Sequence, residues 1–505
     1  MSNSPSYIAY QKKRSPSLAI RHQLDHPVID TDVHTIEYTP LLEEYIAEEG
    51  GGTAVEQFRA AIARGFGYLG NAWYDQSWDE RRAKRSTRPP WWALPTKNTL
   101  DLATVSLPAL LHERIQEAGI DFAVLYPNIA TFAPHIGNPE LRRVVVRAVN
   151  RFNADLFRNY SDRLTPVAAI PLHTPEEGIA ELEYVVKELG LKAALIPGYI
   201  NRPIKALADK YPRDQHPDVA QNGFWVDTYG LDSEYDYDPF WAKAVELKVV
   251  LTTHSAGMGW TARRSISNYM YNHIGHFADA SHALAKALFF GGVTRRFPAL
   301  RVGLLEGGAA WAANLFADLV GHWEKRNGRA IENYNPANVD KELLVELFNR
   351  YGGDVLRGKP LVDSDALIGG ALGRANNFRA QDPDRLDDFA AAGIEKVEDI
   401  AARFVPNFYF GAEADDPTVA FAFNEKVLGT RLNAFWASDS GHWDVPDLTE
   451  VLADTYRLVQ NGALSEQDFR DLVYTHPYNF YAGTNPDFFK GTAIDGAVKK
   501  IKQAA

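Results

Sequence analysis

Residues 27–34 read PVIDTDVH and form the first of the short apolar runs from which the fold is predicted. Its apolar, β-branched start is typical of a buried strand, and Asp32 and His34 stand two residues apart, so that their side chains lie on one face. Seven further short apolar runs follow, several of them after helix-like stretches, a pattern typical of a parallel sheet. The eight runs span residues 27–34, 121–126, 166–171, 193–197, 249–254, 302–306, 408–411 and 435–439.

Eight such strands predict the α/β class and a closed (β/α)8 TIM barrel rather than an open sheet. An open dinucleotide-binding sheet would need a glycine-rich turn after its first strand. Residues 29–38, IDTDVHTIEY, contain no glycine. The sequence therefore favours the barrel.

The spacing of the runs is uneven, which predicts long insertions on the catalytic face, where they act as lids or subunit contacts. The predicted insertions lie at about 45–115, 198–238 and 327–403. The predicted organisation is an exposed N-terminal arm (1–26), a barrel domain (27–485) and a C-terminal tail (486–505).

The segment 73–95 mixes aromatic residues and arginines in a proline-punctuated loop. One interpretation is a lid that contacts substrate through Arg82, Arg88 or Trp91. The other is a clamp at a subunit interface. The sequence leaves both open.

Composition excludes several classes of protein. The 505 residues are 46% hydrophobic and carry a net charge of −12, so a broad nucleic-acid-binding surface is not expected. With no cysteine, disulfides, thiolate metal sites and cysteine nucleophiles are excluded. No apolar run approaches the roughly 20 residues of a membrane span. The N-terminal stretch lacks the apolar centre of a signal peptide, and we expect a cytoplasmic protein with no membrane partner.

Polar residues gather at the carboxyl ends of the predicted strands, which face the active-site mouth of a TIM barrel. Buried charges are costly unless they are paired or bind a metal, so the set predicts a metal site. The metal-competent residues are Asp32, His34, His254, Glu306 and Asp439.

Five ordered motifs now carry a family resemblance: residues 29–38, 175–198, 238–257, 297–311 and 435–444. Together they resemble the amidohydrolase superfamily, in its amidohydrolase-related branch of aminocarboxymuconate-semialdehyde decarboxylase-like metal-dependent hydrolases. The resemblance implies a (β/α)8 barrel that holds a divalent metal. It implies ligands from strands one, five and eight, which are Asp32, His34, His254 and Asp439 in this sequence.

Two departures from the family pattern bear on the metal. The common first-strand His-x-His is Asp32-Val33-His34 here, and Glu306 stands where strand six commonly ends in His. Both exchanges, with Glu37 as a possible addition, enrich the site in carboxylate, which suits Mn²⁺ or Fe²⁺ and can bridge two ions. The site also resembles superfamily members that hydroxylate carbon at a dinuclear non-haem iron-type centre.

Further histidines are candidates near this site. His273 and His276 share a helix face, and His273 is expected either to complete a second metal site or to pack or cap. His442 is expected to act as a general acid/base or to orient a carboxylate, while Asp439 binds metal and moves a proton. The acids of residues 413–416 are expected to be solvated or to cap the next helix, with a role near substrate as the alternative.

Three functions therefore stay open at this point. The first is metal-activated hydrolysis or decarboxylation of a small organic acid; the second is O2-dependent hydroxylation at an Fe/Fe or Fe/Mn pair. The third is a non-catalytic metal-binding subunit. The expected cofactor is one or two divalent ions (Zn, Fe or Mn) per chain, and the expected assembly is a homo- or hetero-oligomer.

Overall fold

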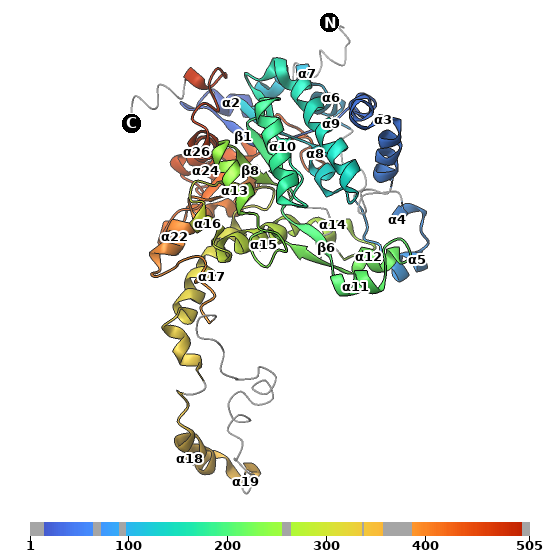
Figure 1. Cartoon of the computed structure of the whole chain (residues 1–505). Coiled ribbons are helices and arrows are strands. Elements are labelled where there is room, and N and C mark those ends of the chain that lie inside the picture. Colours follow the sequence, from blue (N-terminus) through green and yellow to red (C-terminus); the bar gives the residue numbers. More distant parts are fainter. Residues whose placement is uncertain are drawn as a thin grey trace.

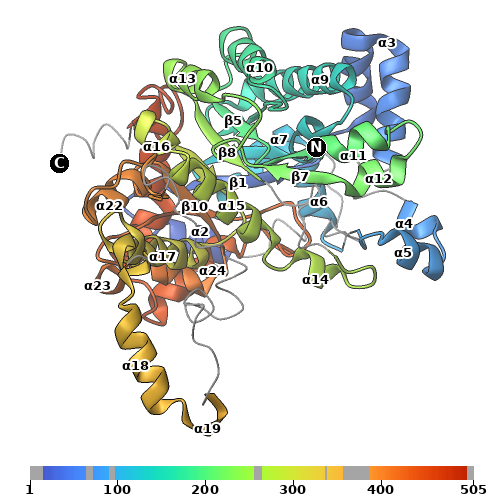
Figure 2. The ribbon, with the colours of Figure 1, turned by 60° about the horizontal axis from the view of Figure 1, so that its bottom comes forward.

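The structure is a computed structural model that describes residues 15–63, 72–89, 97–254, 264–335, 338–356 and 386–496. Helices surround a central set of strands, and one helical excursion stands away from them (Figures 1 and 2). The strands are β1 (Ile29–Thr35), β2 (Phe122–Pro127), β3 (Leu164–Pro166), β4 (Ala168–Ala169), β5 (Ala193–Ile196), β6 (Ile200–Pro203), β7 (Phe224–Asp227), β8 (Val250–Thr253), β9 (Val302–Leu304), β10 (Phe408–Glu413) and β11 (Asn433–Ala437).

The helices of the first half are α2 (Pro16–Arg21), α3 (Thr39–Ala63), α4 (Ala72–Asp75), α5 (Trp78–Lys84), α6 (Thr99–Ser106), α7 (Pro108–Arg114), α8 (Asn128–Phe132), α9 (Pro139–Phe157), α10 (Pro175–Lys187), α11 (Lys205–Lys210), α12 (Pro217–Asn222) and α13 (Asp238–Glu246). Those of the second half are α14 (Tyr269–His273), α15 (His276–Phe290), α16 (Val293–Arg296), α17 (Ala310–Arg326), α18 (Lys341–Tyr351), α19 (Gly353–Leu356), α22 (Glu398–Phe404), α23 (Glu425–Leu428), α24 (Val451–Gln460), α25 (Glu466–Arg470) and α26 (His476–Thr484). None of the helices that the structure describes is long and apolar enough to cross a membrane.

The parallel strands form two arcs, ordered β1-β2-β3 and β11-β10-β9-β8-β5-β4. β3 and β4 are two pieces of one strand, interrupted at Val167, whose N–H donates to a carbonyl of β2 at 3.0 Å. At the other gap, the N–H of His34 donates to the Ser440 carbonyl at 2.8 Å, and the N–H of Asp439 donates to the Asp32 carbonyl at 3.0 Å. Both gaps are thus bridged, and the eight predicted strands form the predicted TIM barrel.

Burial of the strands and capping of the helices explain why these elements form where the sequence predicts them. In β1 every residue is buried, as expected of a barrel strand covered on both faces. Helix α10 begins with Pro175 at its first turn, and the Thr174 side chain accepts the N–H of Glu177 at 3.2 Å. The helix-like stretches before the second, fourth and fifth strands are confirmed as α7, α10 and α13.

The described parts of the insertions consist mostly of helices. Helices α3 to α7 lie between β1 and β2, and an antiparallel pair, β6–β7, with α11 and α12 follows β5. Between β9 and β10, α18 and α19 stand apart from the barrel (Figure 1). Helix α18 has no buried residue, although its Leu343, Leu347 and Tyr351 are apolar.

The described part of the N-terminal arm, from residue 15, packs against the barrel and is not exposed as predicted. Ser17 is buried, and its hydroxyl accepts the N–H of Leu452 at 3.0 Å, which fixes α2 to α24. The described part of the tail also packs, with Phe488 stacked on Tyr481 at 4.6 Å. Residues 1–14 and 497–505 lie outside the described residues.

The segment 73–95 is described up to residue 89, so Trp91 lies outside it. Arg88 Nη1 donates to the Ser267 carbonyl at 2.6 Å, whereas Arg82 is an exposed side chain 3.7 Å from Asp79 Oδ1. Arg88 therefore holds this segment against the residues that precede α14. Its role as a lid or as an interface clamp stays a prediction.

Candidate metal centre

Four predicted ligands converge at the carboxyl end of the barrel strands. One donor atom each from Asp32, His34, His254 and Asp439 lies within 4.8 Å of the others. Asp32 and His34 project from β1, while His254 directly follows β8 and Asp439 lies two residues beyond β11. The strand ends therefore bring residues from distant parts of the chain to one point.

The backbone at two carboxylates is unusual. Glu306 and Asp439 have φ angles of 56° and 53°, a left-handed conformation that non-glycine residues rarely adopt. Such strain persists where the surrounding structure enforces it, commonly at functional sites. Here it occurs just after β9 and β11, where it sets the direction of both carboxylates.

The first group is centred on two imidazoles. His34 Nε2 lies 3.0 Å from His254 Nε2, 3.3 Å from Asp32 Oδ1 and 3.1 Å from Asp439 Oδ1. The two carboxylate oxygens of Asp32 and Oδ1 of Asp439 are buried, and each lacks a hydrogen bond. Nitrogen and oxygen lone pairs directed at one point, with buried oxygens left unsatisfied, fit a divalent cation.

A second group shares two of these residues. It contains His34, Glu306, Asp439 and His442, again with one donor atom each within 4.8 Å. His442 Nδ1 lies 3.0 Å from Glu306 Oε1 and 2.9 Å from Asp439 Oδ2. Because His34 and Asp439 belong to both groups, the donor set is sufficient for one ion or for two adjacent ions.

The electrostatics reflect three carboxylates that are almost fully buried. Burial and the nearby Asp439 raise the pKa of Glu306 well above its usual value. Burial opposes a charged imidazole, yet the pKa of His34 is raised to about 9 by Asp32 and Asp439, and that of His442 to about 9 by Asp439. Without a cation, the site thus balances its buried negative charge by holding protons.

His273 and Glu37 belong to neither group. His273 Nε2 is 3.9 Å from Asp444 Oδ2, and its ring lies 5.5 Å from that of Trp443. Glu37 Oε1 accepts the N–H of Ile129 at 2.6 Å, and burial raises its pKa to about 7. Among the described residues His273 thus lies outside both donor groups, and its metal-binding role stays a prediction.

The acids after the seventh predicted strand were expected either to cap the next helix or to lie near the substrate, and the structure has examples of both environments. The Asp416 side chain accepts the N–H of Thr418 at 2.8 Å, so it caps the following turn. Glu413 is half-buried, and burial and then Asp439 raise its pKa to about 9. Glu413 thus lies within electrostatic reach of the metal-competent groups.

Sequence reasoning missed Asp30, His135 and His173. Asp30 shares a face of β1 with Asp32, and its Oδ1 accepts the N–H groups of Asp32 and Ser438, both at 3.1 Å. Asp30 therefore links β1 to the residue that directly follows β11. The alternation of β1 could have revealed Asp30, and the position of His173 just past the third strand could have revealed that histidine.

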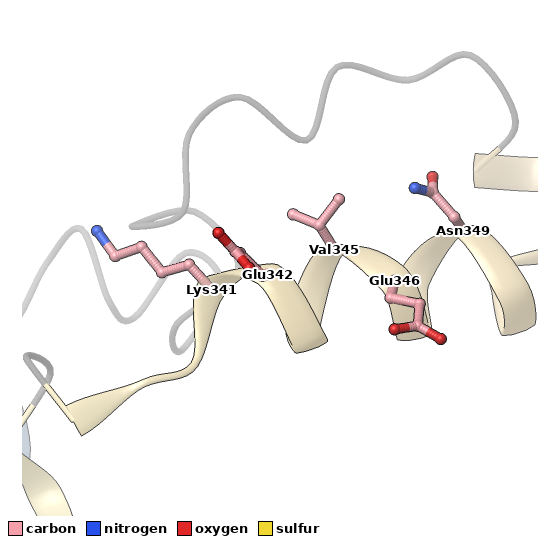
Figure 3. A pocket seen from close by; sticks show the side chains of 5 residues that line it. All are labelled: Lys341, Glu342, Val345, Glu346 and Asn349. Carbon is pink, nitrogen blue, oxygen red and sulfur yellow. The ribbon is translucent and has the colours of Figure 1, made fainter.

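A surface hollow on α18 is unrelated to this centre. All its lining residues lie on α18: Lys341, Glu342, Val345, Glu346 and Asn349 (Figure 3). No strand end contributes to it.

Comparison with known proteins identifies one matching family model, a curated relative and several solved structures. The sequence model of the amidohydrolase family matches residues 105–354. Over these residues, about half of the chain, the protein is similar to the amidohydrolase family. A curated relative, 2-keto-4-carboxy-3-hexenedioate hydratase of Sphingobium sp. (strain NBRC 103272 / SYK-6), is 26% identical over 239 residues. That match covers 46% of this chain and 58% of the relative, so the two are alike over part of their lengths.

Several solved structures align with most of this chain at low sequence identity. A manganese-bound dihydroxybenzoic acid decarboxylase from Polaromonas sp. JS666 is 16% identical, with a TM-score of 0.49, covering 92% of this chain and 99% of that one. A 5-carboxyvanillate decarboxylase from Novosphingobium aromaticivorans, with manganese bound, is 16% identical with a TM-score of 0.47, covering 90% and 96%.

Proposed function

We propose that this chain is a metal-dependent enzyme that decarboxylates, hydrates or hydrolyses a small carboxylate-bearing organic substrate. The observation that carries the proposal is the convergence of Asp32, His34, His254 and Asp439 at the barrel mouth. Substrate sites of TIM-barrel enzymes lie at this end. The curated relative is a hydratase whose named substrate bears several carboxylates, which supports the substrate class.

The donor set favours Mn²⁺ or Fe²⁺ over Zn²⁺, because three carboxylates accompany the imidazoles. We propose one ion held by Asp32, His34, His254 and Asp439, with Glu306 and His442 available for a second. A divalent ion there would polarise a carbonyl or carboxylate oxygen, or lower the pKa of bound water.

The protein's own groups supply the proton transfer in this proposal. His442 Nδ1 and Asp439 Oδ2 are 2.9 Å apart, and the His442 side chain is 22% exposed, while that of Asp439 is 2% exposed. His442 can therefore exchange a proton with a substrate in the mouth while Asp439 keeps its imidazole oriented. A positioned acid–base group of this kind contributes about 10²–10⁴-fold in rate.

A second candidate function is O2-dependent hydroxylation at a dinuclear centre. It is favoured by one observation, that the two groups of donors share His34 and Asp439. A shared carboxylate is able to bridge two ions with its two oxygens. Two bound ions, at least one of them iron, would support this candidate.

We also propose that the chain forms a homo-oligomer through α18, paired antiparallel with α18 of a second copy. An isolated helix of 11 residues is marginal in water, and Leu343, Leu347 and Tyr351 are 49%, 41% and 69% exposed. Antiparallel pairing would place the Glu342 end of one helix beside the Arg350 end of the other.

The test uses protein purified without added metal. Metal content is measured by mass spectrometry, and CO2 release and water addition are assayed on hydroxybenzoates and on 2-keto-4-carboxy-3-hexenedioate, before and after chelation. Turnover that is lost on chelation and restored by Mn²⁺ or Fe²⁺ supports the proposal. Turnover that survives complete metal removal contradicts it, and tightly bound metal with no turnover on any substrate favours the non-catalytic subunit.

A further inference from the structure

The candidate metal ligands occupy only one side of the barrel mouth. They follow or lie on β8, β9, β11 and β1, which with β10 are consecutive in the ring. We call these five strands and their mouth residues the carboxylate half. The remaining strands, β2, β3/β4 and β5, contribute to neither metal-competent group. A substrate that reaches the metal from the mouth has this other half available for contacts with its remaining groups.

Two histidines lie just beyond the strands of that other half. His135 follows β2 and α8, and His173 comes four residues after β4. The Nδ1 atom of His173 is buried without a hydrogen-bond partner among the described residues, and the His135 ring lies 5.9 Å from that of Tyr199. A buried imidazole nitrogen with no partner is a group that a ligand can satisfy.

Two arginines stand behind these histidines, and we call this side the arginine half. Arg142 donates to both carboxylate oxygens of Glu177, at 2.9 and 3.0 Å. Arg202 donates to Asp227 Oδ2 at 2.9 Å and to the His173 carbonyl at 2.7 Å. Both guanidinium groups are therefore fixed, and neither is free to move onto a ligand.

The histidines experience the arginine charges more strongly than those of the paired carboxylates. Burial and then Arg142 lower the pKa of His135 to about 3. Burial, Arg142, His135 and Arg202 lower that of His173 to about 2. Among the described residues, no carboxylate is an opposing cause for either imidazole. Burial therefore favours the neutral form of both rings, and the arginine charges add to this effect.

We infer that the arginine half is a subsite for a second carboxylate of the substrate, remote from the metal, with His135 and His173 as its hydrogen-bonding groups. A neutral imidazole can donate one N–H to an anion, and the fixed arginine charges stabilise the negative charge at short range. This inference deepens the proposed function, on which it rests for the position of the reacting end. It restricts the substrate class to dicarboxylates whose acid groups are separated by a ring or a short chain.

The binding measurement compares matched probes that differ by one carboxylate. Benzene-1,3-dicarboxylate and benzoate, and then glutarate and butyrate, are titrated into the metal-loaded full chain by calorimetry. Because only the dicarboxylate can form the additional charge-assisted hydrogen bond, we expect at least one dicarboxylate to bind about tenfold more tightly than its partner. Equal binding within both pairs, or no binding of any probe, overturns the inference.

Two histidine substitutions test whether the preference for a dicarboxylate arises in the arginine half. In His173→Ala and in His135→Gln, the dicarboxylate should lose its advantage, while metal content and monocarboxylate binding stay unchanged. His322→Ala, an exposed histidine on α17, is the matched control and should keep the preference. A preference that survives both substitutions also overturns the inference.

Two further readouts keep the outcomes separate. Thermal melts identify a variant that fails to fold, in which case the other histidine variant decides. Metal content and turnover test the proposed function independently. Normal metal with no dicarboxylate preference counts against this subsite alone, whereas loss of metal dependence counts against the metal centre.

Discussion

Histidines in the two halves of the barrel mouth differ in the fixed charges beside them. Burial lowers the pKa of His254 even in the carboxylate half, but two other histidines of that half are perturbed in the opposite direction. In the carboxylate half, neighbouring acids raise the pKa of His34 and His442 to about 9 in spite of burial. In the arginine half, burial and arginine lower the pKa of His135 and His173 to about 3 and 2. Histidines of one half thus lie beside carboxylates that could bind a cation, whereas histidines of the other half lie beside arginines that would favour an anion.

The comparison shows why proximity to a strand end does not define a role. All four histidines lie near the mouth, but only those beside buried carboxylates belong to the metal-competent groups. What distinguishes them is the sign of the fixed charge next to them. A variant that removes that charge should erase the difference between the halves.

The largest effect is expected from His254→Ala. His254 Nε2 lies 3.3 Å from Asp32 Oδ2 and 3.0 Å from His34 Nε2, so its loss opens the first donor group. We expect bound metal to fall and activity to become undetectable, with the fold retained. His282→Ala, a histidine on α15 outside both groups, is the control for metal content by mass spectrometry. Normal metal in His254→Ala would remove His254 from the ligand set.

Asp439→Asn should cost about 10²-fold or more in turnover. The substitution removes the negative charge that orients His442 and raises its pKa. Metal binding should weaken less than in His254→Ala, since the amide oxygen can still coordinate. Turnover is measured at saturating metal beside a thermal melt. A lower melting temperature with near-normal turnover would mean that Asp439 has only a structural role.

Glu306→Gln sharpens the question of one ion or two. A neutral amide bridges hard cations poorly, so a two-ion site should lose one ion and shift its preference toward zinc. Mass spectrometry gives the stoichiometry. An unchanged metal count with lower stability would make Glu306 a partner of His442 and His254 only.

The histidines of the arginine half should make the free energy of unfolding depend on pH in mildly acidic solution. His135 and His173 have lowered pKa values in the folded chain, so below pH 6.5 the unfolded chain binds more protons and stability falls as pH falls. Each group contributes at most about 1.4 kcal/mol per pH unit. The groups facing them are Arg142, Arg202 and each other. In chemical denaturation from pH 7 to 4.5, His135→Gln/His173→Gln should lose stability less steeply than the unsubstituted chain, and equal slopes would contradict this account.

The smallest effect on the mouth should come from α18, which stands far from both halves (Figure 1). Leu347→Glu should halve the mass of a dimer in light scattering while leaving metal content and turnover per chain close to normal. Glu346→Gln, on the same helix, is the control. An unchanged mass in Leu347→Glu would exclude α18 as the contact.

Much of the fold was predictable because each barrel strand is a short apolar run, and four of the eight runs end in a metal-competent residue. The sequence also predicts Asp32, His34, His254, Glu306 and Asp439 as neighbours, since parallel strands share one carboxyl edge. It could not decide His273, whose position depends on how α14 packs and not on a strand register. Nor could it show that Ser17 is buried, because that contact is made with α24, more than 400 residues away.

The arginine half was beyond sequence reasoning for a related reason. His135, His173, Arg142 and Arg202 come from a loop, a strand end, a helix and an insertion, with no common spacing. Their mutual influence arises only when the barrel closes and the β6–β7 pair folds back. The charges that matter there are paired, so counting charged residues gives no sign of them.

The central claim is that the carboxylate half holds a divalent metal. Its most direct test is the metal stoichiometry of the unsubstituted chain, purified without added metal, beside that of Asp32→Ala/His34→Ala. We predict one or two tightly bound ions of manganese, iron or zinc per chain, and none in the double variant with its fold intact. A well-folded chain that binds no divalent ion even after incubation with excess metal, or a double variant that retains the full count, would contradict the account.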